Sequence, residues 1–222
     1  MDEDLAAINS ESRNEKIKSF FINNKKLLIV IISLVIVLVL GFYSYQIFKD
    51  RQKEQLSNKY NSAVIEYKSG ESSKVIQSMK QIVEDKDTTY SPLALYFLID
   101  NQLINNKSEI NSLFDILIDN TPLEKEIKNL IIYKKALYNA DFVKENELLN
   151  LLNPLIQSNS IWKSHALYLV AEYFYSQNEK QKSKEFFSQI LILENANQDM
   201  IKEAQKRLNR DCLLYTSPSP RD

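Results

Sequence analysis

Four side chains that could support chemistry fall on one stripe of a predicted helix. His165, Tyr168, Glu172 and Tyr175 are separated by three, four and three residues, a spacing that places them on one helix face. An imidazole near a carboxylate is a common arrangement for proton transfer or metal binding. This stripe holds a single imidazole and a single carboxylate, with no second set of ligands. It therefore predicts a surface for contacting a peptide, or else a solvated or packed helix face.

The composition excludes most other kinds of active site. The 222 residues include two glycines, one histidine and one cysteine. Two isolated glycines cannot form a phosphate-binding loop, a dinucleotide fingerprint or a nucleophile elbow, and one Cys with one His cannot form a Cys/His zinc site. The net charge of −1 provides no basic field for nucleic acid. We therefore expect no catalytic, cofactor-binding or metal-binding residues, no small-molecule or nucleic-acid ligand, and no enzymatic activity.

The elements that position the stripe are predicted to be helices. Scarce glycine disfavours a fold with many tight β-turns, and apolar residues such as Leu95, Leu98 and Ile99 recur at helical spacing. Pro154 should kink or shorten the helix that contains it. Helices are predicted over residues 73–86, 92–105, 109–119, 122–139, 142–157, 161–177, 180–194 and 198–210. The expected N-cap residues are Ser91, Ser108, Thr121 and Ser160.

These helices are predicted to pair into repeated hairpins. Their first helices begin near residues 92, 122, 161 and 198, and a period of roughly 34 residues is typical of tetratricopeptide solenoids. In that register the stripe from His165 to Tyr175 faces the concave, ligand-binding side. The residues expected between helices are Leu167, Val170, Ala171, Phe174, Ser183, Phe187 and Ile190. A generic helical bundle would show similar periodicity and stays an alternative to the solenoid.

A separate apolar segment near the N-terminus predicts a membrane span. The nineteen residues from Leu27 to Tyr45 contain no charged side chain, and a helix of that length covers about 28 Å, close to the hydrocarbon thickness of a bilayer. Lys25 and Lys26 mark one boundary, and Tyr43 with Tyr45 marks the other. No small-residue cleavage site follows, so the segment is interpreted as an uncleaved signal anchor.

The basic residues around this span predict its orientation. Five Lys or Arg residues lie within twenty residues on its N-terminal side and four on its C-terminal side. This small excess favours a cytoplasmic N-terminus, and a short arm before a large C-terminal domain is the usual signal-anchor arrangement. We predict an N-terminal cytoplasmic arm over residues 1–26, the span over 27–48, a helical extension over 49–72 and the repeat domain over 73–211.

The last eleven residues differ in character from the rest of the chain. The 23 Lys and 5 Arg residues indicate an AT-rich gene, whereas residues 212–222 read CLLYTSPSPRD. This string back-translates into one reading frame of a transposon-based sequencing adapter. We interpret it as adapter-derived rather than native and exclude it, with Cys212, from the fold prediction. A natural disordered tail is the alternative interpretation.

The order of these parts resembles the YfgM family over residues from about 15 to 210. The first matching segment is FFINNKKL, directly before the span. The last is Trp162 together with the stretch AEYFYSQNEKQKSKEFF. The matching positions are Phe20, Phe21, Asn24, Lys26 and Leu28 at the membrane entry, and Tyr60 and Ala63 beyond it. Aliphatic residues replace many of the alanines and glycines of that family.

The resemblance implies a location, two partners and a non-enzymatic role. The protein would be a single-pass protein of the bacterial inner membrane with a periplasmic tetratricopeptide-like domain. That domain would associate with the SecYEG translocon and a periplasmic chaperone to assist exported proteins, without a cofactor. Two alternatives stay open at this point: a membrane-anchored scaffold or regulator of cell division or stress signalling, and an accessory domain for an enzyme acting in trans.

Overall fold

The structure is a computed structural model that describes residues 22–213. Within this range all regular structure is helical. The chain forms two compact units, Met1–Gln55 and Leu56–Asp222. The predicted cytoplasmic arm up to residue 21 and the adapter-like tail from residue 214 onward lie outside the described residues.

The first unit contains the apolar segment predicted to cross a membrane. It belongs to helix α2 (Lys25–Lys68), and none of the most apolar 18-residue window of this helix is buried. Val30 and Leu38, for example, are 65% and 64% exposed. The Ser33 hydroxyl donates to the Val30 carbonyl at 2.8 Å, so it is satisfied within its own helix, as expected for a serine in a span. By length and composition, α2 is the one described helix that qualifies as a membrane span.

Helix α2 continues well beyond this segment and ends at a glycine. The sequence between Lys49 and Lys68 contains no glycine or proline, and the helix runs through it without a break. Gly70 has a φ of +92°, and its amide donates to the Tyr67 carbonyl at 3.1 Å while the Glu71 amide donates to the Glu66 carbonyl at 3.3 Å. A left-handed glycine is the usual way to close a helix end. From Leu56 onward α2 belongs to the second unit.

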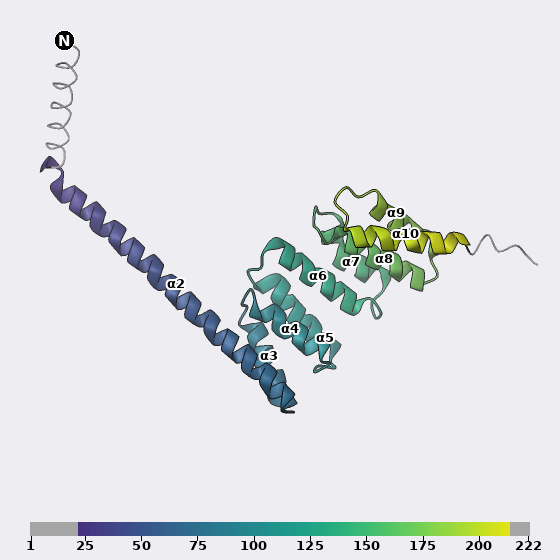
Figure 1. The fold of residues 1–222 in the computed structure, drawn as a ribbon, viewed down its shortest axis with the longest axis horizontal. Coiled ribbons are helices and arrows are strands. Elements are labelled where there is room, and N and C mark those ends of the chain that lie inside the picture. Colours follow the sequence, from purple (N-terminus) through teal and green to yellow (C-terminus); the bar gives the residue numbers. More distant parts are fainter. Residues whose placement is uncertain (1–21, 214–222) are drawn as a thin grey trace, which may run out of the picture. The chain divides into compact units, whose positions relative to one another are not determined.

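In the second unit the remaining helices follow one another in chain order (Figure 1). They are α3 (Ser72–Glu84), α4 (Tyr90–Asp100), α5 (Lys107–Asp115), α6 (Lys125–Asn139), α7 (Glu145–Ile156), α8 (Lys163–Ser176), α9 (Lys180–Leu191) and α10 (Gln198–Leu213), with a π-helical turn, Ile116–Asn120, after α5. Helices α4, α6, α8 and α10 begin at residues 90, 125, 163 and 198, close to the predicted period of roughly 34 residues. We call these four helices the first helices.

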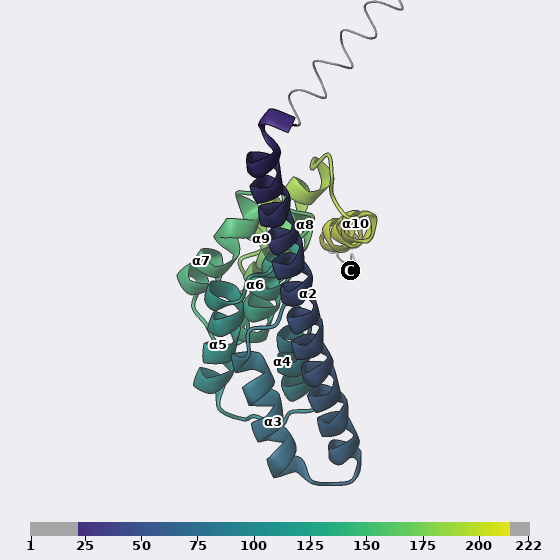
Figure 2. The same cartoon turned by 90° about the vertical axis from the view of Figure 1, so that its left-hand side faces the viewer.

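Three successive apolar clusters hold the hairpins together. The first joins the end of α2 to α3, α4, α5 and α6; the second joins α6, α7 and α8; the third joins α8, α9 and α10. Figure 2 shows α10 beside α8 and α9, where its apolar residues, Met200, Ile201, Ala204 and Leu208, belong to the third cluster. Because each cluster uses neighbouring hairpins only, the unit is built as a repeat array.

The predicted register of the α8–α9 hairpin is confirmed. All seven residues expected between helices are buried: Leu167, Val170, Ala171, Phe174, Ser183, Phe187 and Ile190. Phe174 stacks on Phe186 with ring centroids 5.5 Å apart. Ala171 and Ser183 are buried among these larger side chains, as expected where two helices approach closely.

Two predicted N-caps, Ser91 and Thr121, are wrong, because their hydroxyl groups bind elsewhere. Ser91 lies inside α4, fully buried, and donates to the Ile82 carbonyl at 2.6 Å. Thr121 donates back to the Ile116 carbonyl at 3.1 Å, and α6 begins later, at Lys125. In both cases the side chain donates to a carbonyl of the preceding helical segment rather than accepting from an amide of the next helix.

The two remaining caps are displaced by two residues. Asn106, not Ser108, caps α5 by accepting hydrogen bonds from the amides of Ser108 and Glu109. Trp162, not Ser160, occupies the N-cap position of α8. Pro154 lies in the last turn of α7, which ends two residues later at Ile156, so the expected shortening occurs only at the helix end.

Candidate protein-binding face

The stripe predicted from the sequence lies on α8, and all four of its residues are half-buried. The His165 ring lies 5.0 Å from the Trp162 ring and 5.8 Å from the Tyr133 ring of α6, between centroids. Trp162 and Tyr133 are themselves stacked at 5.9 Å. Aromatic side chains therefore fill the junction between α6 and α8, which agrees with the packing role expected of Trp162 and Tyr133.

A buried polar network fixes this junction. The Ser160 hydroxyl donates to the Glu126 carboxylate at 2.8 Å and accepts from the Asn129 amide at 3.0 Å. The Trp162 indole donates to the Glu126 backbone carbonyl at 3.1 Å. Ser160 and Asn129 are 7% and 8% exposed. Because every bond crosses from α6 to the segment before α8, the network sets the angle between these helices and holds Trp162 in place.

The next junction along the face is bridged by an arginine. Arg207 of α10 donates to the Tyr168 hydroxyl at 3.2 Å and forms an ion pair with Glu172 at 2.7 Å. Burial raises the pKa of Tyr168. Tyr168 also packs edge-on against Phe187, with ring centroids 5.4 Å apart. Tyr175 lies one turn beyond Glu172 and is half-buried.

Sequence reasoning missed Arg207, because the predicted helix starts near residues 161 and 198 align it with Val170 rather than with Glu172. Helix α8 begins at Lys163 and α10 begins at Gln198, so Arg207 occupies in α10 the place that Glu172 occupies in α8. Equivalent positions of neighbouring first helices lie side by side in such an array. Only the observed start of α8, two residues later than predicted, pairs these opposite charges.

His165 gives the face a measurable response to pH. Burial lowers the pKa of His165, against a smaller raising effect of the Ile161 backbone. As the pH falls, His165 is therefore protonated in the unfolded chain at a higher pH than in the folded chain. The free energy of unfolding should then decrease as the pH drops through about 6.5. We expect the melting temperature to fall between pH 7.5 and pH 5.5 in both proteins, and to fall less in the His165→Gln variant than in the unsubstituted protein. Circular dichroism melts at both pH values test this, and equal losses in the two proteins would contradict it.

A cavity opens at the junction between α4 and α6. Its volume is about 240 Å³, and it is lined by Tyr96, Ile99, Asp100, Phe114, Lys134, Leu137 and Tyr138. Phe114 is 1% exposed, and its ring lies 6.2 Å from the Tyr138 ring, between centroids. The Tyr96 hydroxyl is buried and has no hydrogen-bond partner among the described residues. Burial, reinforced by the nearby Asp100 carboxylate, raises the pKa of Tyr96 to about 12.

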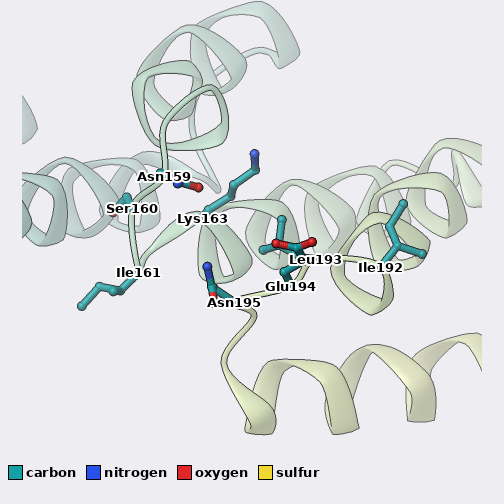
Figure 3. A pocket seen from close by; sticks show the side chains of 8 residues that line it. All are labelled: Asn159, Ser160, Ile161, Lys163, Ile192, Leu193, Glu194 and Asn195. Carbon is teal, nitrogen blue, oxygen red and sulfur yellow. The ribbon is translucent and has the colours of Figure 1, made fainter.

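A second, larger hollow lies between two loops (Figure 3). It has a volume of about 530 Å³ and is lined by residues 159–161 and Lys163 near the start of α8 and by residues 192–195 after α9. Its two isoleucines, Ile161 and Ile192, are 63% and 83% exposed. Ser160 is already bonded to Glu126. Polar and aliphatic residues both line this hollow, with Leu193 beside the two isoleucines.

The described residues contain no group of three or more His, Cys, Asp or Glu side chains placed to hold a metal ion. Comparison with protein families gives a match to a tetratricopeptide repeat-like domain model, which aligns with residues 18–111 of the 222-residue chain. The fold is tetratricopeptide repeat-like. Neither a curated protein nor a solved structure matches the chain.

The position of this match is informative. It begins ahead of α2, includes the apolar segment and extends into α5. The aligned range thus covers the apolar segment, α3, α4 and the first part of α5, whereas α6 to α10 lie outside it. A tetratricopeptide repeat-like fold is typically a scaffold for protein–protein interaction, with an extended face for partners. The first-helix face, with its stripe on α8 and its cavity between α4 and α6, is the candidate partner-binding surface.

Proposed function

We propose that this chain is a non-enzymatic, single-pass protein of the bacterial inner membrane whose repeat-like domain lies in the periplasm. There it would bind the SecYEG translocon and a periplasmic chaperone, and so assist exported proteins. The observation that carries the proposal is the family match over residues 18–111, because it joins the apolar segment to the repeats. The resemblance of FFINNKKL and of the AEYFYSQNEKQKSKEFF stretch to the YfgM family supports the named partners.

The mechanism requires only binding. A membrane anchor keeps the repeat-like domain near the exit of the channel, and tethering of this kind raises effective concentrations to roughly millimolar values. Contacts that are weak in solution then suffice. In this proposal His165, Tyr168, Glu172 and Tyr175 form one part of the contact surface, with Lys25, Lys26, Tyr43 and Tyr45 at the two membrane boundaries.

Co-purification tests the proposal directly. The tagged full-length chain, extracted with a mild detergent, should enrich SecYEG subunits and a periplasmic chaperone. The matched control keeps residues 1–55, which include the apolar segment, and replaces the second unit with an unrelated soluble domain. Equal enrichment by the control would contradict binding through the repeat-like domain, and enrichment of division or signalling proteins instead would favour a scaffold.

The proposed orientation predicts a protease pattern. Because the basic residues favour a cytoplasmic N-terminus, protease added to intact spheroplasts should digest the chain beyond about residue 50 and spare a tag placed before Met1. Immunoblots against the tag and against the second unit provide the measurement. A protected second unit, degraded only after the spheroplasts are lysed, would overturn both the orientation and the translocon proposal.

A further inference from the structure

The three junctions along the first-helix face differ in how they are filled. Trp162 and His165 occupy the junction between α6 and α8, and Arg207 bridges the junction between α8 and α10. The junction between α4 and α6 instead leaves the cavity lined by Tyr96 and Leu137. Among the described first helices, this junction is where a side chain from another molecule can enter without displacing one from this chain.

The interior of the cavity is suited to an aromatic ring. The fully buried Phe114 and the half-buried Tyr138 provide an apolar floor, and Leu137, which is 44% exposed, forms part of the rim. A volume of about 240 Å³ accommodates one large side chain rather than a whole peptide. Aromatic rings favour offset or edge-on contact with other rings, which this floor offers.

The Tyr96 hydroxyl provides the polar contact. It is buried without a hydrogen-bond partner among the described residues, and buried polar atoms in folded proteins are nearly always bonded. Tyr96 is one of the residues that line the cavity, so a backbone carbonyl of an entering segment is the acceptor that we assign to this hydroxyl. Pockets that recognise peptides commonly combine an apolar floor with a few such polar groups.

Charges of opposite sign lie on the two helices that border the cavity. The Lys134 ammonium of α6 lies 5.8 Å from the centroid of the Tyr96 ring, and Asp100 stands at the end of α4. Both side chains are exposed, and neither forms an ion pair with another described residue. A ligand with an acidic group toward α6 and a basic group toward α4 would complement both charges.

We propose that the cavity between α4 and α6 binds a polypeptide segment by inserting one aromatic side chain, with an acidic residue beside Lys134 and a basic residue beside Asp100. This inference deepens the proposed function, on which it rests for the presence of a protein partner. It moves the main anchoring contact from the α8 stripe to the α4–α6 junction. The stripe then serves as the flanking surface of the same face.

Short synthetic peptides provide the test. Fluorescently labelled GSGKFDGSG and GSGDFKGSG, which cover both chain directions, are titrated against the full-length chain in detergent micelles, with anisotropy as the readout. We expect the better of the two to lose about tenfold or more in affinity when its Phe is replaced by Ala, because buried aromatic anchors dominate such interfaces. Equal affinities for the Phe and Ala peptides would overturn the proposal.

Variants of the cavity give a second, independent readout. Tyr96→Phe removes only the hydroxyl and should weaken the better peptide about fivefold while leaving the far-ultraviolet circular dichroism unchanged. Lys134→Glu should weaken it as well, and exchanging the peptide's Asp for Lys should restore binding. Lys125→Glu, on the same helix but outside the cavity, is the matched control. Equal effects of Lys134→Glu and Lys125→Glu would contradict the charge complementarity.

The peptide experiment is separable from the test of the proposed function. Peptide binding without SecYEG enrichment would retain the cavity and reject the translocon as partner. SecYEG enrichment that Tyr96→Phe and Lys134→Glu leave intact, together with no peptide binding, would reject the cavity alone. A dimer in sedimentation that these variants dissolve and the peptides do not displace would assign the cavity to a second copy of this chain and overturn the proposal.

Discussion

Phe174→Ala should lower the free energy of unfolding of the repeat-like unit by about 3–5 kcal/mol. Phe174 is 2% exposed and belongs to the cluster that joins α6, α7 and α8. Its ring stacks on Phe186 and lies beneath the Lys182 ammonium, 4.7 Å from the ring centroid. Removing the ring leaves a cavity between three helices, and natural domains have only about 5–15 kcal/mol of stability in total. Urea titration of the full-length chain, followed by circular dichroism, measures the change.

The matched control is the same substitution at an exposed ring. Phe142 is 58% exposed, and its main contact is the Lys107 ammonium, 3.0 Å from the ring centroid. Phe142→Ala removes that cation–π contact and should cost only about 0.5–1 kcal/mol. If both variants lose the same stability, Phe174 does not act as a core residue and the register of the α8–α9 hairpin is wrong.

The register of the α8–α9 hairpin was predictable from the sequence, because the spacing of apolar residues along a helix indicates which of them are buried. Ala171, Phe174 and Phe187 stand at spacings that turn them to one side of their helices, and that side must face another helix if the chain is to bury apolar area. The same reasoning located all eight helices after α2. The predicted helical extension over residues 49–72 runs past the observed end of α2 at Lys68, because Gly70 adopts a left-handed conformation at little cost and closes the helix there.

The helix ends and the binding face were less predictable, because they depend on contacts between distant residues. Ser91 looked like an N-cap from its neighbour Pro92, yet its hydroxyl reaches the Ile82 carbonyl across a turn. The cavity beside Tyr96 requires three helices to meet, and no single helix carries a signal for it. Arg207 pairs with Glu172 only once the repeat offset is known. A local sequence pattern indicates only which helix a residue belongs to and which side of it is buried. The caps, the cavity and the Arg207–Glu172 pair depend on how neighbouring helices pack against one another.

Paired arginines in the apolar segment should remove the protein from the membrane. Leu34 and Leu38 are 60% and 64% exposed and lie one helical turn apart in α2. An arginine at the centre of a spanning helix costs about 2.5–3.5 kcal/mol on insertion, so Leu34→Arg with Leu38→Arg raises the cost by roughly twice that amount. We expect the doubly substituted chain to leave the fraction that resists carbonate extraction.

The control places one arginine on a surface that is already exposed to water. Ile192 is 83% exposed, after the end of α9, so Ile192→Arg adds a cation without entering an apolar environment. This variant should remain in the carbonate-resistant fraction, and its melting curve should match that of the unsubstituted chain. If the doubly substituted chain also stays in the membrane fraction, α2 does not span the bilayer. Its exposed apolar side chains would then have to be covered by another protein, and every proposal here that depends on the anchor would fail with it.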